Sequence, residues 1–304
     1  MGWLKPKVAD AKKLTIDPPL PQQGRHGIAI AVCVKDEARY IGEWVRFHRA
    51  VGIRHFYIYD NGSTDETRAI LRDLLDADTL TIIPWAGRMK DVGTGTTLNG
   101  QVIVFAHAIL NFGGAYRRMA FIDVDEFLLP KEGHTVEQAL EVVGDFPNVS
   151  LPWHMFATSG HATPPAGPLT LNYTMRGADP MTSKEDVRNF KCIVDPCEVT
   201  EVSVHQFQTR EFGDLTANDA GKRFTRRARK SSEFYSNRFL QLNHYYTKSR
   251  EELMAKLVRG WAYDTSSTKY RDKVLSIVKS IEEDEVEDRA MIDFIERNRI
   301  DLGQ

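Results

Sequence analysis

Two short runs of apolar, β-branched residues near the start of the chain constrain its fold more than any other feature. They are IAIAVCV at Ile28–Val34 and HFYIYD at His55–Asp60. A continuous apolar run of this length is typical of a strand buried on both faces in a parallel sheet. An amphipathic helix pattern lies between them, with Tyr40, Trp44 and Phe47 spaced by four and three residues. The order strand, helix, strand predicts the crossover unit of an α/β fold.

The alternation continues to Pro130 and then loosens into short strands, loops and finally helices. A single strand is expected over Arg117–Pro130, and LNYTMR and FKCIVDP are expected to form a strand pair. The chain turns helical from Ser249, and one further helix is predicted over Thr268–Asn298. We therefore expect an α/β domain with a helical C-terminal extension.

This organisation divides the chain into three parts: a lead-in, a domain and an extension. Pro18, Pro19 and Pro21 stiffen an extended lead-in over residues 1–25, and proline cannot donate to a sheet ladder, so ordered structure is expected from His26. Residues 26–247 form the α/β domain, and residues 248–304 form the extension.

Charge and cysteine usage exclude several classes of protein. The chain has 40 Lys and Arg against 42 Asp and Glu, a balance that argues against dedicated nucleic-acid binding. Its three cysteines, Cys33, Cys192 and Cys197, form no regular framework, as expected in a reducing compartment. No stretch reads as a secretory signal or a membrane span. We expect a cytoplasmic protein, with peripheral contact at the inner face of the cell membrane left open.

Carboxylates gather where the predicted strands end. Asp123 and Asp125 follow an apolar strand, and Glu37 and Asp60 follow the first two strands. Open α/β sheets bind ligands beyond the carboxyl ends of their strands. Asp123 and Asp125 can converge on one hard cation at a bend, although in an extended strand they would point to opposite faces. The alternative is a solvated acidic turn.

Several segments together resemble the family 92 glycosyltransferases and their bacterial family-2-like relatives. The resemblance covers about Ile28 to Gly260, in the family's order. Its segments are VKDEARYIGEWVRFHRAVG, FYIYDNGSTDET, FIDVDEFLLP, WHMFATSGH, FKCIVDP and NHYYTKSREELMAKLVRG. The resemblance implies a GT-A fold, a Rossmann-like mixed sheet flanked by helices, that uses a nucleotide sugar with a divalent metal.

The resemblance also implies roles for residues at the strand ends. Asp60 would bind the uracil or ribose, although Asp-Asn-Gly is also a common turn. Asp123 would face the ribose and the metal, and Asp125 would be the principal ligand of Mn²⁺ or Mg²⁺, which neutralises the diphosphate. The nucleoside pocket would be lined by Cys33, Val34, Lys35 and Glu37.

The resemblance to GT-A enzymes also implies a third metal ligand, a histidine late in the domain. His205 and His244 are the candidates, and His205 is favoured because it closes a strand-like run. Lys191 would contact the diphosphate as a point charge, in a Lys-Cys-Ile-Val segment where the family has Lys-Ser-Ile-Val. Gln101 and Arg88 are weaker contacts to the nucleotide or sugar.

Transfer with inversion requires a base that removes the proton of the acceptor hydroxyl. Asp195 lies about where GT-A enzymes place that base, and His161 is the second choice, although an Asp-Pro turn and a loop hydrogen bond also account for them. Trp153 and Phe156 are suited to stacking on the acceptor sugar, or to the core. The basic segment Lys222–Lys230 would approach an anionic lipid or polysaccharide, fold over the donor, or stay solvated.

The sequence thus favours a metal-dependent, inverting hexosyltransferase. It would move a hexose, with galactose one candidate, from a UDP-sugar to a hydroxyl of a glycan or glycolipid in surface polysaccharide or lipopolysaccharide synthesis. Two alternatives remain: a nucleotidyltransferase that makes a nucleotide sugar, and a non-catalytic glycan-binding protein with the same fold.

Overall fold

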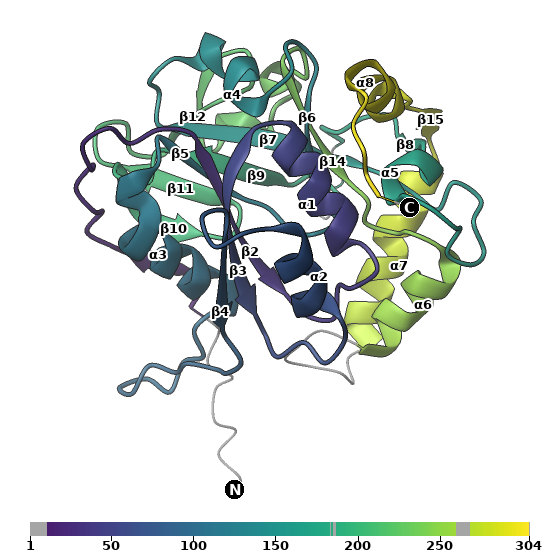
Figure 1. Cartoon of the computed structure of the whole chain (residues 1–304), viewed down its shortest axis with the longest axis horizontal. Helices are drawn as coiled ribbons and strands as arrows, with labels where there is room; N and C mark the ends of the chain where they lie inside the picture. The colour runs from purple at the N-terminus through teal and green to yellow at the C-terminus, as the bar shows by residue number, and fades with distance from the viewer. Residues whose placement is uncertain (1–10, 183, 185–186, 260–267, 304) are drawn as a thin grey trace, which may run out of the picture.

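The computed structural model describes residues 11–182, 184, 187–259 and 268–303. Its centre is a ten-stranded mixed sheet, in which β6 and β14 branch from the main path at β7 (Figure 1). In spatial order the main path is β13 (Arg223–Thr225), β12 (Leu215–Ala217), β7 (Asn148–Met155), β9 (Phe190–Val194), β5 (Arg118–Phe121), β2 (Ile28–Val34), β3 (Ile53–Asp60) and β4 (Leu80–Pro84). The branch is formed by β14 (Leu240–His244) and β6 (Glu126–Pro130).

Smaller sheets and helices surround this centre (Figure 1). One sheet contains β1 (Lys13–Thr15), β10 (Val199–Ser203) and β11 (Gln206–Thr209), and the other pairs β15 (Glu285–Glu287) with β8 (Met175–Gly177). The helices are α1 (Ile41–Ala50), α2 (Thr67–Leu74), α3 (Gly100–Phe112), α4 (Val136–Ala139), α5 (Leu169–Asn172), α6 (Arg250–Arg259), α7 (Thr268–Glu282) and α8 (Ala290–Asn298). The predicted α/β class, a Rossmann-like mixed sheet flanked by helices, is confirmed.

Strand β2 separates two hydrophobic cores. Ile28, Ile30 and Val32 pack on the face covered by α1 and α2. Ala29 and Ala31, which alternate with them, pack on the face covered by α3 and by β10 and β11. Neither face meets solvent, which is why the run IAIAVCV lacks polar alternation.

The parallel centre sets the position of the site. Strand β2 runs parallel to β3 and β5, so the carboxyl ends of all three strands lie at one edge of the sheet. Strand β9 runs antiparallel to β5 and β7, with Cys192 beside Phe121. The amino end of β9 therefore reaches the edge at which the parallel strands end. The expected pairing of LNYTMR with FKCIVDP is wrong, because β8 pairs with β15 instead.

The strand predicted over Arg117–Pro130 is interrupted. Strand β5 ends at Phe121, β6 begins at Glu126, and the residues between them turn. The turn is closed by Glu126, whose backbone N–H donates to the Asp123 carbonyl at 3.1 Å and whose side chain accepts from the Asp123 N–H at 2.8 Å. Strand β6 then pairs antiparallel with β14. The acidic triplet, Asp123-Val124-Asp125, thus lies at a bend, as metal binding by both of its carboxylates would require.

The lead-in is more ordered than expected. Strand β1 precedes the prolines, pairs antiparallel with β10, and packs Leu14 against the core beneath α3. The Arg25 guanidinium then forms a bidentate ion pair with the Asp195 carboxylate, with N–O distances of 2.6 and 2.7 Å. The expectation of ordered structure only from His26 is wrong for residues 11–25, because the proline argument does not apply to Lys13–Thr15. Residues 1–10 lie outside the described residues.

The helical extension also differs from its prediction. The single helix expected over Thr268–Asn298 is two helices, α7 and α8, separated by β15. Strand β15 returns to β8, so the extension is tied to the α/β domain by a ladder. The boundary at residue 247 stays a prediction. Among the described residues, no helix is long and apolar enough to cross a membrane.

The basic segment is anchored at its end. Lys222, Arg223, Arg226 and Arg227 are exposed, whereas Arg229 is 5% exposed. The Arg229 guanidinium donates to the Ser150 hydroxyl and to the His205 carbonyl, both at 2.7 Å. The segment is therefore attached to the wall of the cavity described next, and its predicted partners stay untested.

Candidate active site

A cavity of about 630 Å³ opens beyond the carboxyl ends of β2 and β5. It lies where the topology of an open α/β sheet places a ligand. Nine of the residues expected from sequence line this cavity: Cys33, Glu37, Gln101, Asp123, Asp125, Trp153, Lys191, His205 and His244. The strand ends, the turn before β6, the amino end of β9 and the end of β14 bring these side chains together.

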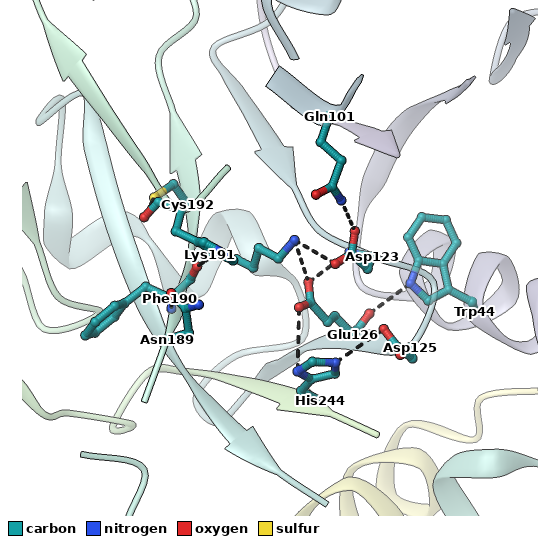
Figure 2. Close-up of polar contacts among 11 residues, drawn as sticks. Trp44, Gln101, Asp123, Asp125, Glu126, Asn189, Phe190, Lys191, Cys192 and His244 are labelled. Carbon is teal, nitrogen blue, oxygen red and sulfur yellow. Dashed lines mark hydrogen bonds and ion pairs between the residues drawn. The ribbon is translucent and has the colours of Figure 1, made fainter. Parts of the chain in front are cut away.

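Asp123 is held by two donors (Figure 2). Gln101, in the first turn of α3, donates to Asp123 Oδ1 at 3.0 Å, and Lys191 Nζ donates to Oδ2 at 2.8 Å. Helix α3 begins here because the Asn99 side chain caps it, accepting from the Gln101 and Val102 backbones. Both Asp123 oxygens thus have a partner, and Lys191 meets the carboxylate rather than standing free for a diphosphate.

Lys191 is a buried cation. Its side chain is 1% exposed, and its Nζ also lies 3.7 Å from Glu126 Oε2. Burial by itself lowers the pKa of a lysine, but Asp123 and Glu126 outweigh burial and raise the pKa of Lys191. Lys191 therefore keeps its charge between the two carboxylates.

Glu126 was missed by sequence analysis, although it follows the acidic triplet directly. It is fully buried, and burial raises the pKa of Glu126, against the lowering effect of Lys191. Its backbone carbonyl accepts from the Trp44 indole at 2.8 Å, which fixes the turn to α1. Its Oε1 lies 3.8 Å from His244 Nδ1 (Figure 2), and neither atom has a hydrogen-bond partner in the described part of the chain.

Asp125 and His244 form the second pair. Asp125 Oδ1 lies 3.5 Å from His244 Nε2, and the Asp125 carbonyl accepts from the Tyr245 N–H at 2.8 Å. Burial acts to raise the pKa of Asp125, but His244, Lys248 and Lys256 outweigh it and hold that pKa below its usual range. Asp125 is therefore a carboxylate at neutral pH. Of the two candidate histidines, His244 is the one that meets an acidic residue of the triplet.

His205 occupies the opposite wall. Its Nδ1 lies 3.0 Å from the Phe190 carbonyl, and its ring meets the edge of Trp153 at a centroid distance of 5.4 Å. Burial, then the nearby Lys191, lowers the pKa of His205 to about 3, so its imidazole is neutral. The favoured assignment of His205 as a metal ligand is not supported, because its contacts are with a carbonyl and an indole.

Trp153 and Cys33 complete the wall between these groups. The Trp153 ring packs on His244 at 4.5 Å, and its buried Nε1 has no hydrogen-bond partner among the described residues. An indole N–H in this state is a donor available to a ligand. Burial, then Asp123, raises the pKa of Cys33 to about 12, so this thiol stays protonated and serves as lining.

Other predicted binding residues lie outside the cavity lining. Val34 packs in the core, Lys35 is exposed, and Arg88 is exposed on the loop after β4. Asp60 is buried and accepts from the Ser63 N–H at 2.9 Å, as a turn residue does. Phe156 stacks on Tyr245 in the core, so its predicted contact with an acceptor is not supported.

Neither predicted base faces the cavity. Asp195 follows β9, four residues beyond Lys191, and the antiparallel direction of β9 carries it to the opposite edge of the sheet beside Arg25. His161 Nε2 lies 3.0 Å from the Asn172 carbonyl, and its ring packs on Tyr173. The structure does not support either assignment.

The lead-in and the helical extension add cations that sequence analysis did not select. Lys12 precedes β1, Lys256 lies on α6 and Lys273 lies on α7, and all three line the cavity. A lysine on an amphipathic helix usually reads as solvated surface. The packing of the extension on the domain identifies Lys256 and Lys273, and the pairing of β1 with β10 identifies Lys12.

The comparisons with known proteins identify the family of this chain. The sequence model of glycosyltransferase family 92 matches residues 28–284, most of the chain. A family 92 protein of Ricinus communis is 28% identical over 179 residues, which are 57% of this chain and 30% of the relative. A family 92 protein of Oryza sativa subsp. japonica is 28% identical over 183 residues, 56% of this chain and 29% of the relative. The chain therefore belongs to glycosyltransferase family 92, and it matches less than a third of the length of these relatives.

Among solved structures, Staphylococcus aureus TarS in complex with UDP-GlcNAc resembles part of the fold. The match has 14% identity and a TM-score of 0.32, and covers 46% of this chain and 37% of TarS.

Proposed function

We propose that this protein transfers a hexose from a UDP-sugar to a hydroxyl of a glycan or glycolipid acceptor, with inversion at the anomeric carbon. Family membership supports glycosyl transfer. The observation that carries the proposal is the cavity at the carboxyl ends of β2 and β5, where Lys191 balances Asp123 and His244 meets Asp125. Galactose is the first hexose to test, and surface polysaccharide synthesis is the proposed context.

The residues around Asp125 fit a divalent cation such as Mn²⁺ or Mg²⁺. A carboxylate oxygen and an imidazole nitrogen 3.5 Å apart are a suitable ligand pair, and Glu126 beside His244 Nδ1 would orient the ring. No group of three His, Cys, Asp or Glu ligands occurs in the described part of the chain. Asp125 and His244 would hold the cation, and the other positions would be taken by diphosphate oxygens and water. When bound, the cation supplies neutralisation of the leaving diphosphate.

The other cavity residues would bind and orient the donor. Asp123, fixed by Gln101 and Lys191, would accept a hydrogen bond from a ribose hydroxyl. The unpartnered Trp153 N–H would donate to a sugar hydroxyl.

The acceptor's proton needs a base, and we assign this role to His205. With Nδ1–H donating to the Phe190 carbonyl, the lone pair lies on Nε2, where it can take the proton as the acceptor oxygen attacks.

The proposal is tested by product analysis. Wild-type chain with Mn²⁺, UDP-galactose and surface-polysaccharide fragments should release UDP and form a product with the anomer inverted, as read by NMR. D125N should lose more than about 99% of UDP release and of Mn²⁺ affinity, whereas D123N should keep Mn²⁺ binding. Release of pyrophosphate would instead identify a nucleotidyltransferase, and no turnover with any UDP-sugar would leave only glycan binding.

A further inference from the structure

The basic segment Lys222–Lys230 concentrates positive charge in a chain whose formal net charge is -2. It contains no acidic residue, and its cations are Lys222, Arg223, Arg226, Arg227, Arg229 and Lys230. None of these cations lies within 4 Å of a carboxylate oxygen in the described part of the chain. By contrast, the nearest arginines on either side of the segment, Arg210 and Arg238, lie 3.9 and 3.7 Å from a carboxylate oxygen.

Arg229 is a buried cation whose hydrogen-bond partners are neutral. Lys191, the buried cation of the cavity, faces two carboxylates, whereas the Arg229 guanidinium donates to a hydroxyl and a carbonyl. Its guanidinium carbon lies 4.4 Å from the centre of the Phe190 ring, and its buried Nε has no hydrogen-bond partner among the described residues. Burial of a charge without a counterion is costly. The unpaired guanidinium is therefore an independent sign that an anion binds beside it.

Positive charge continues from the basic segment to the wall of the first cavity. Burial lowers the pKa of Arg229, and the nearby Arg226 lowers it as well. Arg229 in turn acts with burial and with Lys191 to lower the pKa of His205, whose carbonyl it holds. The basic segment therefore stands behind the histidine to which we assign the acceptor's proton.

The outer cations of the segment are presented to solvent. Strand β13 places Arg223 over the Phe146 ring, with 4.4 Å between the guanidinium carbon and the ring centre. Arg226 and Arg227 follow directly and are exposed. A guanidinium can donate two parallel hydrogen bonds to one carboxylate, sulfate or phosphate group. This arrangement suits a ligand that carries several acidic groups along its length.

A glycan fits the basic segment better than a membrane does. Surfaces that bind a bilayer combine cations with apolar side chains that enter the acyl region. None of the large apolar side chains that the described residues expose lies in the basic segment. The segment is also tied to the cavity wall through His205, where an acceptor sugar would have to arrive.

We propose that the basic segment binds acidic groups of the acceptor, so that the preferred acceptor is an anionic glycan. Arg226 and Arg227 contact its carboxylate, sulfate or phosphate groups, and Arg229 supplies the buried charge behind them. This inference rests on the proposed function, because it makes the segment part of the acceptor site.

The test compares glycans that differ in charge. Isothermal titration calorimetry on the full chain uses tetragalacturonate, its methyl ester and a heparin tetrasaccharide as probes. The wild type should bind tetragalacturonate about tenfold more tightly than the ester, and added NaCl should weaken that binding. R226Q/R227Q should weaken tetragalacturonate binding by about tenfold and change binding of the ester and of UDP by less than about twofold.

The matched control is R289Q/R297Q, which removes the same number of charges from the extension. Arg289 and Arg297 lie at the two ends of α8, are exposed, and do not line the first cavity. R289Q/R297Q should bind tetragalacturonate as the wild type does. An equal loss in the two double variants would show that net charge alone acts, and would overturn the inference.

Three other results would also overturn it. They are wild-type binding of neither anionic glycan, unchanged tetragalacturonate binding in R226Q/R227Q, and wild-type binding to phosphatidylglycerol vesicles that depends on Arg226 and Arg227 while the glycans do not bind. Failure of the proposed function looks different. The wild type would then bind the anionic glycans through these arginines and release no UDP from any UDP-sugar.

Discussion

Lys191 carries a full charge in the interior because two carboxylates face it. Its removal would leave Glu126, and in part Asp123, as buried charges without a counterion. Loss of one partner of a buried ion pair costs about 3–5 kcal/mol. We expect K191M to lower the free energy of unfolding by this amount in a urea titration.

The control for Lys191 is the double variant K191M/D123N. Because it removes one of the stranded charges, it should recover part of the lost stability. A loss of less than about 1 kcal/mol in K191M would contradict the charge balance described here.

His205 tests the assignment of the base. We expect H205Q to reduce kcat by about a hundredfold, while the Kd for UDP changes by less than about twofold, because general-base catalysis contributes about 10² or more. Because the pKa of His205 is lowered to about 3, wild-type kcat should not fall through the usual histidine range between pH 7 and pH 5.5. A steep acid limb near pH 6.5 would point to another base.

At the scale of elements, the two ends of β9 have different roles: one reaches the cavity and the other stabilises the lead-in. Its amino end carries Lys191 into the cavity, and its carboxyl end leads to Asp195, which binds Arg25 of the lead-in. We expect D195N to leave kcat/KM within about twofold and to lower the free energy of unfolding by about 1–3 kcal/mol, since it weakens a charge-assisted pair.

R25M removes the other partner of the Arg25–Asp195 ion pair. It should reproduce the stability change of D195N, and the double variant should add little to either single variant. A hundredfold loss of kcat in D195N would restore Asp195 as a catalytic candidate.

The elements that sequence could predict are those with a clear period. The runs Ile28–Val34 and His55–Asp60 correspond closely to β2 and β3 because both faces of these strands are buried. The break between β5 and β6 was not predictable, because the residues around it are as apolar as a strand and the turn depends on the Glu126 side chain. Strand β1 was missed because it is short and needs β10 as its partner.

The candidate site likewise contains residues that sequence could predict and residues that it could not. Asp123 and Asp125 could be predicted because they end a strand, and family resemblance located Lys191 and His244. Lys256 could not be predicted as a cavity residue, because its position depends on the docking of α6. The structure does not support Asp195 as the base for a similar reason. The direction of β9 decides which edge of the sheet a residue reaches, and sequence alone does not give that direction.

For the whole molecule, buried histidines predict acid sensitivity. His48 and His154 are 0% and 1% exposed, and burial lowers the pKa of each to about 3. The unfolded chain takes up these protons near pH 6.5 and the folded chain does not, so stability is lost as pH falls below 6.5. Between pH 7.5 and pH 5.5 each histidine contributes a loss of about 1.4 kcal/mol.

This loss is measured by urea unfolding at the two pH values. Glu43 and Glu126, whose pKa values are raised by burial, act in the opposite sense, so the histidine contribution is isolated with H48Q. The difference in stability between the two pH values should be about 1.4 kcal/mol smaller in H48Q than in the wild type. An identical pH dependence in the two proteins would show that His48 titrates normally.

The burial of β2 on both faces has an evolutionary consequence. Unless a bulge absorbs it, as at the start of the β2–β3 pairing, a residue inserted into or deleted from this strand would exchange the side chains facing the two cores beyond that point. Length changes among homologous chains should therefore be rare in Ile28–Val34 and collect in exposed connections such as residues 86–95. That loop can drift in length while the strand keeps a fixed number of residues.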